Sequence, residues 1–270
     1  MSFDVVNLKE RIGSEVRTDI DTLLTADTAH KLRALLVERG VLVFKSLNLG
    51  DEQQLTLTRL MGALRNEGDN GVYKVTLDRN ENARADYLKG SFLWHLDGTH
   101  DDVPVFASLL SGRRLSKTGG QTEFANSYAA YETLPDAMKR KIADLKVVHS
   151  VETSMRRAGV DASDDNLRHW RQIPDRTHQL VWSHRSGRKS LVIGCHASHV
   201  AGMERGEGER LLQELLDWTT RPERVYRHEW SVGDMLIWDN TGVLHRAEPY
   251  PLDSGRMMHR TTLIGEEAFA

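Results

Sequence analysis

Two short segments of the chain carry side chains that can bind one metal ion. His95 and Asp97 are two residues apart in Trp94-His95-Leu96-Asp97, and His245 follows the triplet Trp238-Asp239-Asn240. Alternate residues of an extended strand project to the same face, so we expect His95 and Asp97 to reach one ion from a strand. Two imidazoles and one carboxylate are the ligand set that holds non-haem Fe(II) and leaves positions open for small ligands.

Other histidines compete with this assignment. A second His-x-Asp triplet, His100-Asp101-Asp102, lies in a polar run that favours a turn, whereas Trp94 and Leu96 flank the first as a buried strand requires. Cys195, His196 and His199 also form a metal-like cluster, but no fourth zinc ligand is evident. Because His196 and His199 follow a strand-like run, hydrogen-bonded structural histidines are the preferred interpretation.

Two arginines near the end of the chain are suited to bind a carboxylate. Arg256 and Arg260 are four residues apart, so on a strand of about 3.3 Å per residue their backbones lie about 13 Å apart. A guanidinium donates two parallel hydrogen bonds to a carboxylate, and the apolar neighbours Met257 and Met258 predict partial burial. Thr122, which follows a Gly-Gly turn, is a candidate to assist with its hydroxyl.

The bulk properties exclude several classes of protein. The 270 residues have a net charge of −3 and 28% charged residues, which gives no reason to expect nucleic acid or an anionic membrane as partner. Cys195 is the only cysteine, so an intrachain disulfide is excluded and a reducing, cytoplasmic location is expected. The sequence has no apolar run long enough for a transmembrane helix and no signal-peptide pattern at its start.

Strand-like runs dominate after residue 70, and the pattern predicts one mainly β domain over residues 1–270, a sandwich or jelly roll with flanking α-helices. The polar stretch 153–176 reads as a surface loop or lid, and residues 185–188 as a hairpin turn. The expected helices are 26–38, 51–64, 135–145 and 209–218. The expected strands are 41–44, 71–77, 106–110, 179–184, 189–193, 225–230, 235–238 and 257–264.

Taken in order, these motifs resemble the taurine dioxygenase-like (TauD/TfdA) family of Fe(II)/2-oxoglutarate-dependent dioxygenases. The resemblance covers nearly the whole chain, and its most specific part is the spacing from His245 to the two arginines. The motifs that carry it are Trp94-His95-Leu96-Asp97, Gly119-Gly120-Gln121-Thr122, Tyr128-Ala129-Ala130-Tyr131-Glu132, Trp238-Asp239-Asn240 with His245, and Arg256-Met257-Met258-His259-Arg260.

The resemblance implies a double-stranded β-helix (jelly-roll) core and Fe(II) held by His95, Asp97 and His245. It implies that Arg256 and Thr122 bind the distal carboxylate of 2-oxoglutarate, and that Arg260 lies near the iron, touching the cosubstrate or an anionic group of the substrate. Dioxygen and 2-oxoglutarate would be consumed, succinate and CO₂ released, and a C–H bond hydroxylated. Relatives are often dimers or tetramers, which implies a homo-oligomer.

The sequence departs from taurine-specific enzymes near the substrate. Ser91 stands where those enzymes place an asparagine, and no histidine near Tyr73 matches their second sulfonate contact. We therefore expect Ser91 and Tyr73 to face a different, more apolar small molecule. One alternative is that this molecule carries a carboxylate, which Arg260 or Lys74 would bind. Asp97 argues against halogenation, because halogenating relatives lack this carboxylate. Hydroxylation, cleavage and desaturation stay open as outcomes.

Two further classes of function remain open from the sequence. One is a non-catalytic jelly-roll protein that uses the pocket as a ligand sensor, and the other is a zinc-dependent hydrolase or lyase with the same ligands. Metal content and dependence on 2-oxoglutarate distinguish these classes from an oxygenase.

Overall fold

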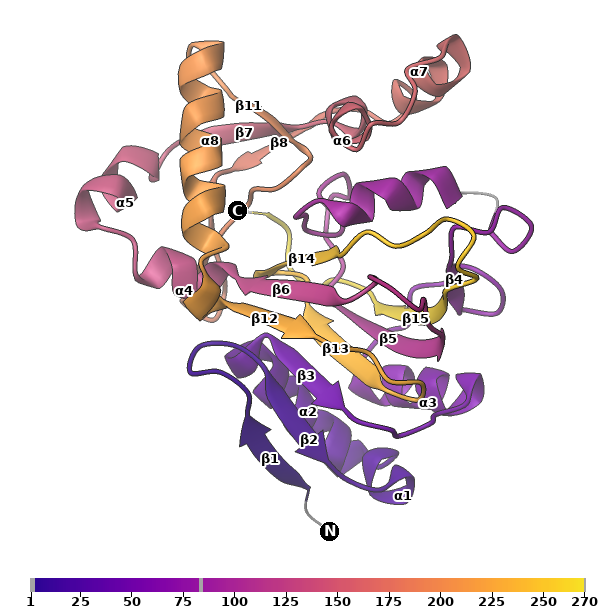
Figure 1. The fold of residues 1–270 in the computed structure, drawn as a ribbon. Coiled ribbons are helices and arrows are strands. Elements are labelled where there is room, and N and C mark those ends of the chain that lie inside the picture. Colours follow the sequence, from indigo (N-terminus) through magenta and orange to yellow (C-terminus); the bar gives the residue numbers. More distant parts are fainter. Residues whose placement is uncertain (1–2, 83–84, 270) are drawn as a thin grey trace.

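The computed structural model describes residues 3–82 and 85–269, and most of its strands gather into two facing sheets (Figure 1). The larger sheet has seven strands, and antiparallel pairing places β13 between β3 and β5 at its centre. Its spatial order is β1 (Asp4–Asn7), β2 (Ser14–Arg17), β3 (Val41–Phe44), β13 (Met235–Asp239), β5 (Ala107–Arg114), β15 (Met257–Leu263) and β4 (Tyr73–Val75).

The smaller sheet covers one face of the larger one. It consists of β12 (Val225–His228), β6 (Thr122–Asn126) and β14 (Val243–Ala247), with β6 in the middle. Phe124 of β6 and Val243 of β14 pack in one buried cluster with Trp238 of the larger sheet. This cluster is the core between the sheets, and the expected jelly roll with helices packed outside is confirmed.

Alternating apolar residues explain why the central strands are buried on both faces. In β3, Val41 and Val43 face the smaller sheet, while Leu42 and Phe44 belong to a second cluster beneath helices. Successive side chains of a strand point to opposite faces, so a run of four apolar residues fills both layers. The helices on that outer face are α1 (Ile20–Leu23), α2 (Ala26–Arg39) and α3 (Asp51–Met61).

A third layer lies at the other side of the smaller sheet and is built around α8 (Arg205–Thr219) (Figure 1). Leu211 and Leu215 of α8 pack with Trp182 and Leu244 in a shared cluster. The other elements of this part are α4 (Ser127–Glu132), α5 (Asp136–Ile142), β7 (Lys146–His149), β8 (Arg176–Gln179), β9 (Val181–Ser183), β10 (Lys189–Leu191), β11 (Ala197–Val200) and the 3₁₀ helix η2 (Pro222–Arg224).

The expectation of a surface loop over residues 153–176 is wrong. The segment contains most of α6 (Val151–Arg157) and all of α7 (Asp164–Trp170), which pack against the 3₁₀ helix η1 (Ala85–Phe92). Trp170 is 1% exposed and packs with Met155 in a small hydrophobic cluster that is separate from the main core. The polar residues misled the prediction because they cover the outer face of two short helices whose few apolar residues meet inside.

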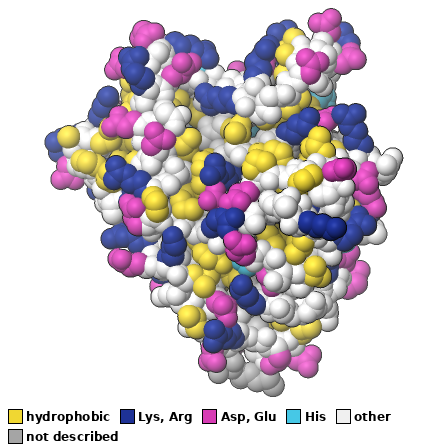
Figure 2. All heavy atoms as spheres, viewed as in Figure 1, with side chains coloured by type: hydrophobic (Ala, Val, Ile, Leu, Met, Phe, Trp, Pro, Cys, Tyr) yellow, Lys and Arg dark blue, Asp and Glu magenta, His cyan; other side chains and the backbone are white. Residues whose placement is uncertain are grey.

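The remaining expected elements are present with shifted ends. The hairpin of β9 and β10 is confirmed, and β15 matches the predicted strand within one residue. The strand predicted at 71–77 is limited to three residues, and the Gly-Gly turn is followed by a strand, β6. No pattern in the sequence indicated β1, β2, β7, β8, β11 or β14. Figure 2 shows basic and acidic side chains interspersed over the visible face. Among the described residues, no helix is both long and apolar enough to cross a membrane.

Candidate active site

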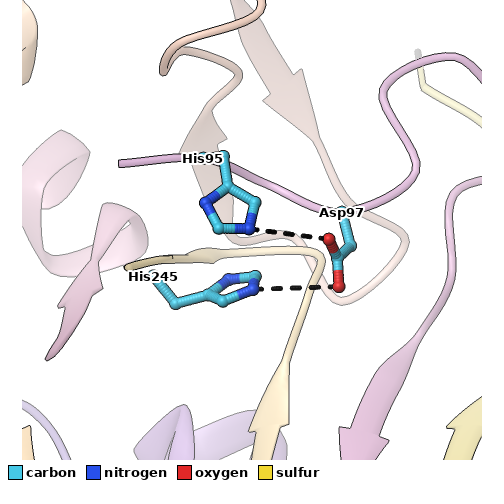
Figure 3. A group of neighbouring side chains, drawn as sticks. All are labelled: His95, Asp97 and His245. Atoms are coloured by element: carbon cyan, nitrogen blue, oxygen red, sulfur yellow. Dashed lines mark ion pairs between the residues drawn. The ribbon is translucent and has the colours of Figure 1, made fainter. Parts of the chain in front are cut away.

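The three predicted metal ligands meet at one point between the sheets and the segment that follows η1 (Figure 3). The Nε2 atom of His95 lies 3.7 Å from Oδ1 of Asp97, and Nε2 of His245 lies 3.8 Å from Oδ2 of the same carboxylate. One ligand atom from each of the three residues lies within 4.8 Å of the other two. In the part of the chain that the structure describes, no other such group of three occurs. The side chains therefore surround one position for an ion.

The backbone that presents these ligands differs from the expected strand. His95 forms a single β-bridge with His245 of β14, and Asp97 already belongs to a turn. The prediction that His95 and Asp97 project from one extended strand is therefore wrong, although both side chains reach the same point. The turn, rather than the alternation of a strand, aims the carboxylate at the imidazoles.

Hydrogen bonding and burial prepare the ligands for a metal. The Nδ1 atom of His95 lies 2.8 Å from the carbonyl of Leu93, which can only accept, so Nδ1 carries the proton and Nε2 offers its lone pair. Burial, followed by the nearby His95, lowers the pKa of His245 to about 3. Burial alone would raise the pKa of Asp97, but His245, Arg260 and His95 outweigh it and lower that pKa to about 2. At neutral pH the site offers neutral imidazole and carboxylate, as a divalent metal requires.

Arg256 is a buried cation without a carboxylate of its own. Its side chain donates to the carbonyl of Gly120 at 3.1 Å and lies over the ring of Tyr250. Arg256 is 3% exposed, and among the described residues it forms no ion pair. Burial lowers its pKa. A guanidinium in this state is stabilised by a bound anion, and the carboxylate of a small ligand fits that need.

The surroundings of Arg256 explain the Gly-Gly turn. Gly120 has a φ of +81°, and a Cβ atom there would come within 2.9 Å of Nε of Arg256, so glycine allows the close approach. Gly120, Arg256 and Trp230 line a pocket of about 200 Å³. Thr122 lies beside it, accepting a hydrogen bond from Nε1 of Trp230 at 2.9 Å. No motif in the sequence pointed to Trp230 or Tyr250.

Arg260 lies beside the metal ligands, as expected, but it is already paired. Its Nη1 atom lies 3.4 Å from Oδ2 of Asp97, and its Nε atom lies 3.4 Å from Oε1 of Glu67. The hydroxyl of Thr262 donates a short hydrogen bond to Glu67. The ring of Tyr73, opposite Arg260 in the β4–β15 pair, lies 5.1 Å from the guanidinium. No pattern in the sequence pointed to Glu67.

The other predicted substrate contacts have mixed outcomes. Tyr73 lies within reach of the site through Arg260, and its hydroxyl accepts a hydrogen bond from Asn82. The hydroxyl of Ser91 donates to the carbonyl of Leu88 within η1. Lys74 pairs at the surface with Glu81 at 2.9 Å. Tyr73 is thus the best placed of the three for contact with a substrate.

His196 is nearer to the site than the sequence suggested. Its ring centroid lies 6.5 Å from that of His95, and it lines a pocket of about 250 Å³ together with Asp97 and Arg260. Burial lowers the pKa of His196 to about 3. His199, by contrast, is hydrogen-bonded to Ser198 on β11 and fits the predicted structural role. Because His196 follows a strand of a different sheet, only the fold brings it to the metal ligands.

Comparison with sequence families gives one match that spans the chain. Residues 4–262 match the family described as "Taurine catabolism dioxygenase TauD, TfdA family". The matched range contains all three candidate metal ligands and both arginines.

Curated relatives cover almost the full length of the chain. The (S)-phenoxypropionate/alpha-ketoglutarate-dioxygenase of Sphingobium herbicidovorans is 33% identical, over 99% of this chain and 96% of that protein. The alpha-ketoglutarate-dependent 2,4-dichlorophenoxyacetate dioxygenase of Cupriavidus pinatubonensis is 34% identical, over 97% and 93%. Among solved structures, AAD-2 in complex with Mn(II) and N-oxalylglycine has a TM-score of 0.86 and 32% identity, covering both chains completely.

Proposed function

The chain belongs to the TauD, TfdA family of taurine catabolism dioxygenases, and from this premise we propose that Fe(II) is its metal and that its substrate is a small, largely apolar organic molecule. It is an alpha-ketoglutarate-dependent dioxygenase with a His-Asp-His metal site. In the proposed reaction, dioxygen and 2-oxoglutarate are consumed, a C–H bond of the substrate is hydroxylated, and succinate and CO₂ are released. We further propose that residues 1–270 act as one catalytic domain in the cytoplasm.

Two features carry this proposal: a group of side chains that can bind a cation, and a buried cation that can bind an anion. The His95, Asp97 and His245 side chains enclose a position that a divalent metal fits, while Arg256 is a buried cation without an anionic partner among the described residues. Together they match the two ends of a molecule that chelates a metal at one end and has a carboxylate at the other. 2-Oxoglutarate is such a molecule.

Each residue has a role that follows from its contacts. His95, Asp97 and His245 would hold the metal, and a set of three protein ligands leaves positions for small ligands. Arg256 binds the distal carboxylate of 2-oxoglutarate. Thr122 accepts from Trp230 and keeps its own hydroxyl hydrogen to donate to the same carboxylate. When bound, Fe(II) supplies the activation of dioxygen that the protein residues lack.

Mn(II) in the AAD-2 complex supports a divalent metal of this type. Two imidazoles and one carboxylate hold Fe(II) in oxygenases and zinc in some hydrolases. The preference for Fe(II) therefore comes from the alpha-ketoglutarate-dependent relatives.

The substrate class is an extension from the named relatives. Those enzymes act on phenoxypropionate and 2,4-dichlorophenoxyacetate, in which an aromatic ring is joined through an ether oxygen to a short chain. Tyr250 lies over Arg256 and Tyr73 lies over Arg260, so an aromatic ring covers each arginine. Phe92 extends the first surface, packing edge-on against Tyr250 at 5.5 Å. We propose that a ring or alkyl body of comparable size lies against this surface.

The test is a titration of metal-free protein with Fe(II) and then 2-oxoglutarate under nitrogen. The metal–oxo acid chelate has a weak visible charge-transfer band, which we expect in the wild type. Arg256→Ala should weaken the band by raising the Kd for 2-oxoglutarate at least about thirtyfold, and Asp97→Ala should abolish it. Arg114→Gln, an exposed arginine on β5, is the matched control and should leave the band unchanged.

Two results would contradict the proposal. Tight zinc binding without a band would favour a hydrolase or lyase, and ligand binding without any metal would favour a sensor protein.

A further inference from the structure

Both cations that the sequence offers to a substrate carboxylate already pair with carboxylates of the chain. Lys74 pairs with Glu81, and both side chains are more than a third exposed, so solvent screens this pair. Arg260 and Glu67 are only 23% and 19% exposed. The pair beside the metal ligands is therefore the one that can change the binding of a ligand.

The pocket beside Asp97 has no unpaired cation among its described lining residues. Arg65 pairs with Asp101 at 2.7 Å, and Arg260 pairs with Asp97 and Glu67. The charged and titratable residues that line this pocket of about 250 Å³ are Arg65, Asp97, His100, Asp101, His196 and Arg260.

The balance of charge follows from these pairs. Two arginines face three carboxylates once Glu67 is included. The pocket therefore has a net charge of −1. A divalent metal and the chelating carboxylate of 2-oxoglutarate together add +1, so the net charge becomes zero, and Arg256 neutralises the distal carboxylate. An anionic substrate would add an unmatched negative charge in a half-buried pocket, whereas an uncharged substrate would not.

We propose that Glu67 is a specificity-determining residue that competes with substrate anions for Arg260, so that the group of the substrate beside Asp97 is uncharged, such as an amide, an ester or an alcohol. This inference rests on the proposed dioxygenase site and concerns only the end of the substrate next to Arg260. It distinguishes this chain from the relatives named for phenoxy acids.

The contacts of Glu67 hold it in this role. Thr262 of β15, two residues after Arg260, donates its hydroxyl to the Glu67 carboxylate, and Thr262 is 2% exposed. Tyr73 covers the guanidinium from the neighbouring strand. A substrate carboxylate that approaches Arg260 meets an anion that a buried hydroxyl already fixes.

The test compares two ligands of the same shape and different charge. The Kd values of 2,4-dichlorophenoxyacetate and its primary amide are measured by calorimetry on protein loaded with Mn(II) and 2-oxoglutarate under nitrogen. We expect Glu67→Gln to bind the acid at least about tenfold more tightly than the wild type, because Arg260 is released. The Kd of the amide should change less than about threefold.

Two further variants make the result specific. Glu81→Gln removes a carboxylate from the exposed Lys74 pair and should leave both Kd values unchanged. In Arg260→Gln, adding Glu67→Gln should give no gain for the acid. If Glu67→Gln does not fold, which circular dichroism reports, Glu67→Ala replaces it.

The proposal is overturned if the wild type binds the acid as tightly as the Glu67 variant, or if the acid binds neither protein. Failure to bind Mn(II) and 2-oxoglutarate would instead overturn the proposed function, and the inference with it.

Discussion

The backbones of His95 and His245 are joined by two hydrogen bonds, in which each amide donates to the carbonyl of the other residue, at 3.1 and 2.9 Å. The bridge links the segment after η1 to strand β14, which are 150 positions apart in the chain. The ring centroids of the two histidines are consequently 4.1 Å apart. The fold thus brings two metal ligands together through main-chain contacts that need no metal.

A preformed site predicts that removal of the metal leaves the fold intact. We expect metal-free protein to keep its far-ultraviolet circular dichroism spectrum, while Mn(II) at a hundredfold excess over its Kd adds about 2.7 kcal/mol of stability. For a chain of this size the gain corresponds to a rise in Tm of about 5–10 °C. Asp97→Ala should show no such rise, and loss of secondary structure on chelation would contradict a preformed site.

The sequence was sufficient to select the three side chains that meet at one point, but not to predict their backbone. His95, Asp97 and His245 were found because a metal restricts which side chains can serve, and their types are visible without a fold. The expected strand at His95 was wrong because a local pattern of alternating residues does not distinguish a strand from a single bridge followed by a turn.

Glu67 and His196 could not be found from the sequence for a different reason. Glu67 lies in an irregular segment. It reaches the site because the amide of Arg65 donates to the carbonyl of Thr262, and the amide of Ile264 donates to the carbonyl of Ala63, which joins this segment to β15. His196 follows the β9–β10 hairpin and approaches His95 only when the third layer is assembled. Such contacts depend on pairings between distant segments, and no local periodicity records them.

The helices found in place of the expected loop give a prediction on stability. Trp170 at the end of α7 is buried against Val151 and Met155 of α6, so Trp170→Ala should lower the free energy of unfolding by about 3–5 kcal/mol, measured with urea. Arg168→Ala alters an exposed residue of the same helix and should change it by less than about 0.5 kcal/mol. Equal effects of the two substitutions would support a loop.

The lowered pKa of His184 predicts how the free energy of unfolding depends on pH. Burial, followed by the charge of Arg188, lowers the pKa of His184 from 6.5 to about 4. Between these values the unfolded chain binds a proton that the folded protein does not, so stability falls as the pH decreases from 6.5 towards 4. Above pH 6.5 both states are neutral at this residue and the effect disappears.

His184→Gln should therefore reduce the loss of stability between pH 7 and pH 5, as measured by urea unfolding at both values. Glutamine keeps a hydrogen-bonding group for Ser190, which lies 2.7 Å from Nε2 of His184. His30→Gln, an exposed histidine on α2, is the control and should retain the wild-type difference. A variant at 184 with an unchanged difference would show that this residue does not carry the effect.

Alanine substitutions at two glycines with similar φ values distinguish the effect of backbone strain from the effect of a contact with Arg256. Gly120 and Gly187 have φ values of +81° and +83°, so alanine at either position should cost about 1–2 kcal/mol of stability. At Gly187 nothing lies within 4 Å of the added Cβ atom, whereas at Gly120 it would lie 2.9 Å from Nε of Arg256. Gly120→Ala should therefore also displace the guanidinium and raise the Kd for 2-oxoglutarate at least about tenfold, while Gly187→Ala leaves it unchanged. If both variants bind 2-oxoglutarate as the wild type does, the position of Arg256 against Gly120 is not needed to hold the cosubstrate.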